Sequence, residues 1–473
     1  MPNIIEQKPS FDVLPVGQDI IFVVSNASVV AQELKVKFIA EVHISSGTPP
    51  NLSTNDNVVG TFKTTPNNAG VGMFDLSSIV ENYVKADNMA RSPAKYKGVM
   101  ANDVPFPMHM IDKYSRNSNS VRYLAVQFKI EYLGGDPSYP DVVDTASGNA
   151  VNTASFTVFN GYLKDTQYLE YSGNTNQNFG WDWSKYHLLN ATWSKFLTNA
   201  PTTQSANIED YGTLAFLYPE LQSSSYEMDR IDIRYYDSDG SYLTAETVMR
   251  TWTNGAFTTY VDLTTYHMLF FGCYPGNLQN SSTTFQTLVA AGTIQGGHYT
   301  VQALNAGDEV SEEIRINVTC PDLKNYEPIR LTWLNQFGAW DYFTFNKKST
   351  RSISTKGSTY NQLAGSWDDL TYRADSYKGG KKSFRVNATE KIKMNTDFVS
   401  EDYNTMFEEL INSPEVYVLE GFHEDNANAL LNTYVTPVRL TTSSFIRKTQ
   451  ANDKLIQYTF EVEKSKTLRT QSV

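Results

Sequence analysis

Two hydrophobic periods occur along the chain, and the period-two pattern dominates. Between residues 35 and 45 every even-numbered position is apolar, whereas the odd-numbered positions are mostly polar and include His43. This alternation predicts a half-buried strand, with His43 on the side that faces solvent. The pattern recurs between residues 121 and 133. Shorter apolar runs bounded by turn residues predict further strands at 20–25, 58–64, 155–163, 212–218, 229–236, 241–247, 298–304, 312–318, 329–334, 339–346, 383–394, 416–419, 436–441 and 455–463, with 298–304 and 312–318 as an antiparallel pair.

Two stretches have the period of an amphipathic helix instead. In the first, apolar residues recur at positions 76, 79, 80, 83 and 84, and Asp75 precedes them as a candidate N-cap. In the second, apolar residues occupy positions 403, 406, 407, 410 and 411, and Ser400 is the candidate cap. Ser413 precedes a proline and therefore avoids the α region. We predict helices at about 76–85 and 401–412, and one helical turn or more near 285–291.

The order of these elements sets the expected fold class. The strands are not regularly separated by long helices, which disfavours a parallel α/β sheet. No repeat of 20–50 residues is evident, which disfavours solenoids and propellers. We predict a mainly β protein with antiparallel, β-sandwich-like domains and short helical inserts. A length of 473 residues leaves room for about three domains. They are expected at 1–160 with one short helix, at 161–322, and at 323–473 with one amphipathic helix.

Charge and hydropathy narrow the expected partners. The chain has 39 Lys and Arg against 51 Asp and Glu, a net charge of −12. Its one basic cluster is Lys378, Lys381 and Lys382, so we predict no nucleic-acid partner. The N-terminus lacks a basic start followed by an apolar run, which predicts no secretory signal. The longest apolar run, Met268–Tyr274, is too short to span a bilayer, so membrane insertion is not expected. That run is either a core strand or a surface that is buried on assembly.

Motifs that could support chemistry are few. Asp237-Ser-Asp-Gly240 is similar to the start of a calcium loop, but position 12 would be Val248, so a hairpin turn is the better interpretation. The stretch Lys378–Lys382 lacks the spacing of a phosphate loop and predicts a basic hairpin tip. Cys273 and Cys320 could pair, although spacing alone does not decide this. None of the six histidines has metal-ligand spacing: His43, His109, His187, His267, His298 and His423.

One acidic residue has the surroundings of a sugar site. Asp182 lies between Trp181 and Trp183, and aromatic faces stack on sugar rings while an acid can bind hydroxyls or cleave a glycosidic bond. The alternative is that both tryptophans pack inside the middle domain. We assign no catalytic, cofactor-binding or metal-binding residue, expect no cofactor, and predict that the protein is not an enzyme.

Four segments of the sequence are similar to those of a known group of proteins. They are residues 327–346, 396–403 leading into 408–417, 14–19 and 72–83. Together they resemble a group of virion structural proteins of tailed bacteriophages, of the type that infects Bacteroidetes-like hosts. The resemblance implies a tail or baseplate component made of β-domains.

The resemblance also implies partners and a location. Such a component would be a homo-oligomer among other virion proteins, assembled in the host cytoplasm. It implies no catalytic residues. The alternatives are a receptor- or glycan-binding module of the virion, with a host surface glycan as partner, or a polysaccharide-degrading enzyme.

Overall fold

The chain folds into antiparallel sheets with few short helices in a computed structural model, which confirms the predicted mainly β fold. Unit 1 comprises Met1–Cys320 and Leu334–Asp341, and unit 2 comprises Pro321–Trp333 and Tyr342–Val473. The predicted third domain begins at 323, close to the start of unit 2. A further boundary at 160/161 stays a prediction. The structure describes residues 3–53, 57–90, 95–96, 99–100, 106–112, 114–133, 142–144, 150–164, 186, 194–218, 228, 230–250, 252–253, 256–257, 267–305, 307–319, 326–366, 370–420 and 434–469.

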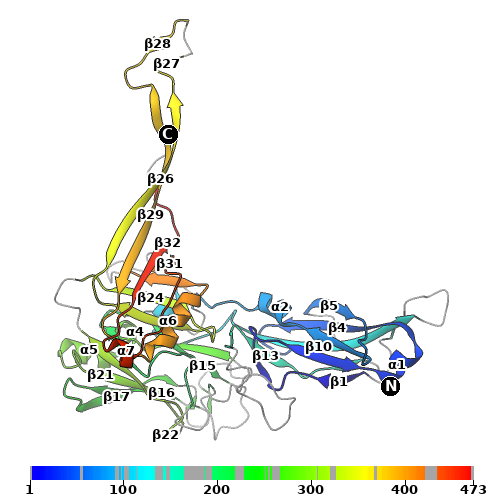
Figure 1. Cartoon of the computed structure of the whole chain (residues 1–473). Coiled ribbons are helices and arrows are strands. Elements are labelled where there is room, and N and C mark those ends of the chain that lie inside the picture. The colour runs from blue at the N-terminus through cyan, green and yellow to red at the C-terminus, as the bar shows by residue number, and fades with distance from the viewer. Residues whose placement is uncertain are drawn as a thin grey trace. The chain divides into compact units, whose positions relative to one another are not determined.

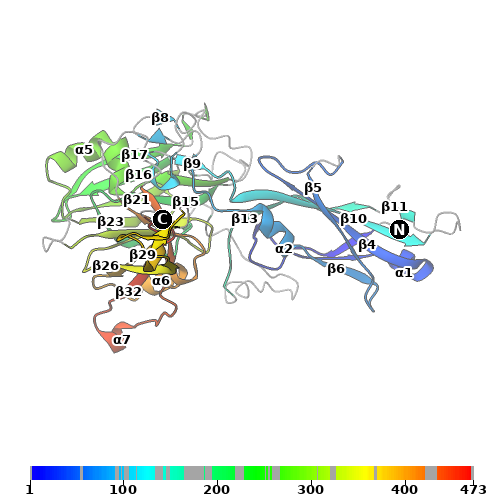
Figure 2. The ribbon, with the colours of Figure 1, turned by 90° about the horizontal axis from the view of Figure 1, so that it is seen from above.

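The first part of unit 1 consists of two facing sheets. The larger sheet has the order β2-β13-β10-β4-β5, and β10 also pairs with β11 and β12. The smaller sheet has the order β1-β3-β6. The strands are β1 (Ile4–Gln7), β2 (Val13–Pro15), β3 (Ile21–Ser25), β4 (Leu34–Ser45), β5 (Val58–Thr64), β6 (Val71–Asp75), β10 (Val121–Leu133), β11 (Val142–Asp144), β12 (Val151–Asn152) and β13 (Phe156–Phe159). The helix α1 (Ala27–Gln32) precedes β4 (Figures 1 and 2).

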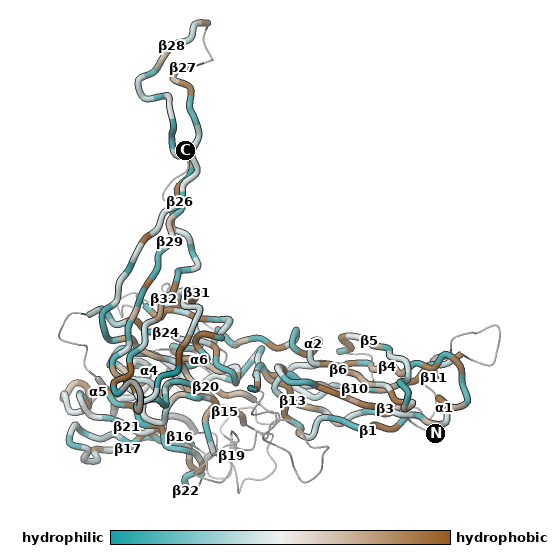
Figure 3. Tube along the Cα trace, in the orientation of Figure 1, coloured by the Kyte–Doolittle hydropathy of each residue, from teal (hydrophilic) through white to brown (hydrophobic). Residues whose placement is uncertain are grey.

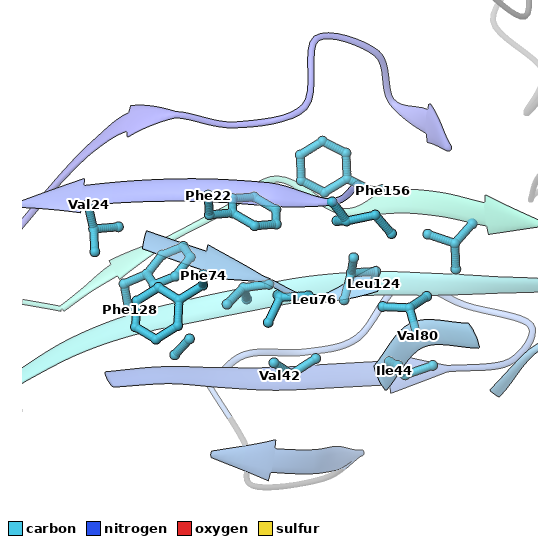
Figure 4. Packing of buried hydrophobic residues seen from close by; sticks show 14 of the residues in the cluster. Phe22, Val24, Val42, Ile44, Phe74, Leu76, Val80, Leu124, Phe128 and Phe156 are labelled. Carbon is cyan, nitrogen blue, oxygen red and sulfur yellow. The ribbon is translucent and has the colours of Figure 1, made fainter. Parts of the chain in front are cut away.

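The core of these sheets follows the predicted alternation. The even-numbered residues of β4 from Val36 to Ile44 are buried. They pack with aromatic rings from both sheets (Figure 4). Phe22 of β3 lies 5.6 Å from Phe128 and 5.8 Å from Phe156, measured between ring centroids. Rings at this separation add attraction to the burial of apolar surface. The alternation of apolar residues in the sequence therefore corresponds to one closed hydrophobic core.

The prediction that His43 faces solvent is wrong. Only 1% of His43 is exposed. Its cross-strand neighbour Ala125 and the nearby Tyr123, on the same face of the sheet, are buried as well. This end of the sheet is therefore covered on both faces, so a polar residue that alternates with core residues is also enclosed. A two-residue period shows which positions share a face, but not whether that face is covered.

The second part of unit 1 contains the middle strands and two adjacent helices. A six-stranded sheet has the order β14-β23-β21-β16-β17, with β22 beside β21, and a three-stranded sheet has the order β15-β20-β9. The predicted antiparallel pair is confirmed as β21 and β23. The elements are η2 (Met108–Met110), β9 (Tyr114–Arg116), β14 (Thr203–Asn207), β15 (Thr213–Tyr218), β16 (Arg230–Tyr236), β17 (Tyr242–Arg250), β20 (His267–Gly272), α4 (Pro275–Ser281), α5 (Thr283–Ala290), β21 (His298–Asn305), β22 (Asp308–Glu309) and β23 (Ile314–Thr319).

The strand β20 contains the longest apolar run of the chain. Met268, Leu269 and Phe270 have no exposed surface, and Phe271 has 1%. Both neighbouring strands, β15 and β9, pair with β20. The run is therefore a core strand of the folded chain, and the alternative that it is buried only on assembly is wrong. Two short pairs complete unit 1, namely β7 (Lys95–Tyr96) with β8 (Val99–Met100), and β18 (Trp252–Thr253) with β19 (Ala256–Phe257).

Unit 2 is built on a seven-stranded sheet with the order β25-β24-β30-β31-β32-β29-β26. The sheet strands are β24 (Ile329–Leu334), β25 (Trp340–Phe345), β26 (Thr350–Gln362), β29 (Gly380–Asn395), β30 (Val416–Leu419), β31 (Val435–Leu440) and β32 (Thr459–Lys464). Two short strands, β27 (Gly365–Ser366) and β28 (Arg373–Ala374), pair with each other, and α7 (Gln450–Asp453) precedes β32. The helix α6 (Tyr403–Asn412) buries Met406, Phe407 and Leu410. The ring of Phe407 lies 5.3 Å from that of Phe460 on β32.

Both predicted helices exist, but neither is capped as expected. The first is α2 (Ser77–Val80) continued by the 3-10 turn η1 (Glu81–Tyr83), and its N-cap is Leu76. Asp75 instead ends β6, where its carboxylate accepts a hydrogen bond from the Ser77 N–H. At α6 the N-cap is Asp402, and the Ser400 hydroxyl donates to the Asp402 carboxylate. The apolar period indicates that a helix forms, whereas its first residue depends on local backbone geometry.

Candidate functional site

The most distinctive feature of unit 2 is a long hairpin formed by β26 and β29 (Figure 1). The two strands pair antiparallel from Thr350 opposite Lys393 to Gln362 opposite Gly380, with one irregularity between Ser358 and Thr359. The strands β27 and β28 lie in the connection between them. We call Thr350–Asn395 the arm.

Only the root of the arm belongs to the body of the sheet. The neighbouring strand β32 pairs with β29 at Lys391–Asn395, and Leu468 near the C-terminus forms an isolated bridge to Ala388. Beyond these contacts, β26 and β29 have only each other as ladder partners within the described part of unit 2. At about 3.3 Å per residue, the ten residues from Ile353 to Gln362 extend roughly 33 Å. A two-stranded hairpin by itself is marginally stable in water, so this ribbon needs a further source of stability.

The core-facing side of the sheet continues along the arm without a cover. In β29 the side chains of Met394 and Ile392 are fully buried. Alternation places Val386 on the same face further along the strand, and cross-strand pairing places Ile353 there, opposite Glu390. Val386 is 43% exposed and Ile353 is 64% exposed. The apolar stripe is therefore part of the core at Ile392 and Met394, is interrupted by the ion pair of Arg351 with Glu390, and faces solvent further out at Ile353 and Val386.

The outer end of the arm also has exposed apolar and aromatic side chains. Along the trace the arm is mostly hydrophilic or neutral, with a short hydrophobic stretch beside β27 (Figure 3). Leu363, Tyr372, Tyr377 and Phe384 are each more than half exposed. Of the 19 exposed large hydrophobic side chains in the described residues, seven lie in the arm, which is more than its share of the chain length. Exposed apolar side chains gathered in one hairpin are typical of a site of contact with another molecule.

The arm is basic, in contrast to the rest of the chain. Residues 350–395 contain nine Lys and Arg against four Asp and Glu, a net charge of +5. The remaining residues contain 30 Lys and Arg against 47 Asp and Glu, a net charge of −17. Six of the arm's cations form no ion pair with any carboxylate in the described residues: Lys356, Arg373, Lys381, Lys382, Arg385 and Lys393. This positive charge is not compensated within the described structure of the arm.

Lys378–Lys382 lies in the outer arm, at the turn between β28 and β29. The Lys378 N–H donates to the Asp375 carbonyl, and the Lys378 ammonium lies 3.1 Å from the Asp375 carboxylate. Gly379 and Gly380 both have positive φ, which only glycine adopts without strain. The two glycines therefore form the turn, and the lysines on either side of them are basic positions near the end of the arm.

A network of charged side chains holds the root of the arm. The Arg351 guanidinium donates to Glu327 at 2.7 Å, to Glu390 at 2.9 Å and to Glu420 at 2.8 Å. The Lys464 ammonium lies 2.7 Å from Glu420 and 3.2 Å from Glu390. These five residues come from five separate segments of unit 2. The network therefore joins both arm strands to β30 and β32.

The pKa directions agree with this arrangement. Burial would by itself raise the pKa of Glu390 and of Glu420, but hydrogen bonds and charge from Arg351 and Lys464 lower both pKa values below the ordinary value. Hydrogen bonding to Glu327 is the main reason why the pKa of Arg351 is raised. The network therefore favours the charged forms of Arg351, Glu390 and Glu420.

The remaining sequence candidates fall at structural positions. Asp237 closes the turn between β16 and β17, where its carboxylate accepts from the N–H groups of Asp239 and Ser241. His109 is buried and lies 5.0 Å from the ring of Trp340, and His298 stacks on Tyr236 at 4.7 Å. Cys273 is buried. His267 begins β20. Asp182, its flanking tryptophans, His187, Cys320 and His423 lie outside the described residues.

Two buried carboxylates in unit 1 are also accounted for by local structure. Asp87 accepts hydrogen bonds from the N–H groups of Ser118, Asn119 and Ser120 and from two of their hydroxyls, so it holds one turn in place. Asp341 accepts from the Thr198 hydroxyl at 2.6 Å. Burial raises the pKa of the Asp341 carboxyl to about 6, against hydrogen bonds from Thr198 and Asn335 that favour the charged form.

Metal-binding and membrane-spanning features add no further site in the described residues. Among the described residues, no group of three or more His, Cys, Asp or Glu is arranged to hold a metal ion. Within the same ranges, no helix is long and apolar enough to cross a membrane.

Sequence reasoning missed the strand β26. Its sequence, Thr350–Gln362, is rich in Ser and Thr and has no regular apolar positions, because neither face is buried along most of its length. The strand predicted at 383–394 lies in β29. A strand of this length needs a pairing partner on at least one edge, because its backbone N–H and C=O groups would otherwise stay unpaired. The lack of a predicted partner for it could therefore have indicated β26.

The longest of the segments that resemble phage virion proteins, residues 327–346, forms a pair of strands joined by a turn. Residues 329–345 are β24, a turn and β25, and the Asn335 amide in that turn donates to the Leu197 carbonyl at 2.9 Å, a contact within unit 1. No protein-family model and no curated protein sequence matches the chain.

Proposed function

We propose that this chain is a structural component of a bacteriophage virion, associated with the tail or baseplate, that acts by protein–protein assembly. The observation that supports the proposal is the arm, a two-stranded ribbon with exposed apolar side chains and uncompensated positive charge. A ribbon of this kind is stabilised when a neighbouring molecule covers it. In this proposal the protein has no catalytic role, and its partners are other virion proteins and further copies of itself.

The physical argument for assembly is the difference between the arm and the rest of unit 2. The body of the sheet is covered by α6, which buries Met406, Phe407 and Leu410. The arm has no such helix against either face in the described residues, although its inner face continues the apolar stripe. A hydrophobic ribbon that persists uncovered is also a hazard for aggregation. A dedicated binding partner accounts for both features.

The test is to look for the chain in particles. Purified virions should contain the protein at a fixed ratio to the major tail proteins, and electron microscopy should place it in the tail with the arm against a neighbouring subunit. Absence of the chain from purified virions would refute the proposal. If instead the isolated chain binds host cells or glycans and is absent from symmetric parts of the tail, the receptor-binding alternative replaces it.

A further inference from the structure

We infer that the arm of one copy binds the acidic six-stranded sheet of unit 1 in a second copy of this chain. The inference rests on the proposed function in one respect, because it identifies the partner in the assembly. It draws on three observations: the charge of the arm, the charge of that sheet, and the apolar stripe that the arm leaves exposed.

The first observation is complementary charge. The sheet is formed by strands from the segment Thr203–Thr319, which contains 14 Asp and Glu against four Lys and Arg, a net charge of −10. Ten of these acidic residues lie in the described part of the segment. The arm has a net charge of +5. Opposite potentials steer two surfaces together and disfavour wrong partners. In a pure solution of the protein, this sheet on another copy therefore offers the basic arm an acidic docking surface.

The acidic side chains of the sheet are accessible. Glu209, Asp239, Asp308 and Glu313 are exposed, and none of them forms an ion pair with a cation in the described residues. Strand pairing places Glu209 and Asp239 near one end of the sheet, and Asp308 and Glu313 near the other. Each end thus offers two carboxylates to an incoming cationic arm.

The second copy also explains the exposed apolar groups. Charge alone would give a weak, salt-sensitive contact, because exposed ion pairs contribute little. The outer arm adds Leu363, Tyr372 and Tyr377, and aromatic side chains are enriched at the centres of protein interfaces. On the sheet, Tyr242 of the edge strand β17 is 59% exposed. The contact we infer therefore has an apolar centre and a charged rim.

An arm-to-body contact has a defined symmetry. The arm and the acidic sheet are different surfaces, so the contact is head-to-tail, and repeated contacts close into a ring or continue as an open filament. Two copies that exchange arms reciprocally form the smallest such ring, whereas a dimer through arm-to-arm contact is not expected. The mode of assembly is therefore testable by the size of the oligomer as well as by its affinity.

The experiment uses the full chain and sedimentation velocity over a wide range of protein concentration, at low and at high NaCl. We expect concentration-dependent association that weakens at high salt. In the arm variant K381E/R385E, both replaced residues are exposed. Its dissociation constant should rise about tenfold or more, because like charges then face each other. The control K8E/K466E makes the same charge change at exposed sites outside the arm and should associate like the parent.

Charge reversal on the body identifies the docking site. E209K/D239K changes one end of the sheet and D308K/E313K changes the other. We expect one of these to weaken association alone, and to restore it when combined in the same chain with K381E/R385E. If neither body variant weakens association or restores it in the combined chain, the inference is overturned. Circular dichroism of each variant checks that it is folded.

Two other outcomes would also overturn the inference. The chain could stay monomeric at every concentration, or the arm could bind duplex DNA in a manner that K381E/R385E abolishes while self-association is absent. The proposed function is tested separately by the presence of the chain in virions. A monomeric chain that is found in virions would refute self-docking and leave the proposed function intact. A chain that self-associates through the arm but is absent from virions would refute the proposed function and leave self-docking intact.

Discussion

Replacing Arg351 by methionine removes the guanidinium that joins three carboxylates at the root of the arm. Methionine keeps most of the length of the side chain but none of its charge. Glu327, Glu390 and Glu420 then share only the Lys464 ammonium, which reaches two of them. We expect the arm strands to separate from the sheet more often, while the hydrophobic core beneath α6 stays intact.

The expected magnitude follows from the exposure of each pair. The Glu327 side chain is 53% exposed, so its pair with Arg351 contributes about 0.5 kcal/mol. The side chains of Glu390 and Glu420 are 14% and 24% exposed, and hydrogen bonds to charged groups at such sites contribute about 1 kcal/mol each after screening. The total is about 2.5 kcal/mol, which corresponds to a roughly 70-fold change in an opening equilibrium.

The assay is amide hydrogen exchange resolved by peptide. In the Arg351→Met variant, peptides from the arm and the adjoining part of β32 should exchange roughly 70-fold faster, and peptides from unit 1 should be unchanged. The control is Arg439→Met. Arg439 is 73% exposed and pairs with Glu463 at 3.4 Å, so its loss should change exchange by less than about threefold. Equal exchange in the arm of Arg351→Met and the parent would refute the reasoning.

The effect should also depend on pH in a defined direction. The pKa values of Glu390 and Glu420 are lowered in the folded state, so these groups bind protons more readily when the chain is unfolded. Their stabilisation is present above the ordinary value of 4.5 and is lost as the pH falls through the lower folded values. The difference between Arg351→Met and the parent should therefore shrink below about pH 4.

Three further predictions test other parts of the structure. Leu410→Asp, at a fully buried position of α6, should destabilise unit 2 by about 4 kcal/mol in urea unfolding, whereas the exposed Asn412→Asp should have little effect; an unchanged melting temperature for Leu410→Asp would contradict the core assignment. Burial raises the pKa of Asp341 to about 6, so the free energy of unfolding of unit 1 should fall as the pH rises from about 4 to about 6. In urea titrations Asp341→Asn should reduce this fall, and an equal fall in the variant and the parent would argue against a role for Asp341. Ile353→Thr with Val386→Thr should leave the melting temperature nearly unchanged, because both side chains are exposed, but should weaken self-association in sedimentation velocity; Ile446→Thr, 76% exposed outside the arm, is the control, and equal weakening by both would refute a specific role for the stripe.

The sequence by itself determined most of the individual elements. The strand predicted at 58–64 is β5, the one at 121–133 is β10, and the apolar face of the predicted helix at 401–412 is the buried face of α6. Periodicity succeeds here because each element has one buried face, and burial selects apolar side chains at a fixed spacing. The turn at Lys378–Lys382 could be predicted for a related reason, since adjacent glycines mark backbone that other residues avoid. The structure places this turn between β28 and β29 and not at the tip of the hairpin.

Only the tertiary structure decided which faces are covered. His43 alternates with core residues as a solvent-facing side chain would, yet a second covered face encloses it. The strand β26 shows the opposite case, because it has no buried face and therefore no apolar pattern to detect. The arm is recognisable only when β29 is seen to continue past β32 with β26 as its one partner. Composition determines how much charge and apolar surface the chain has, whereas strand pairing over long sequence separations decides where they meet.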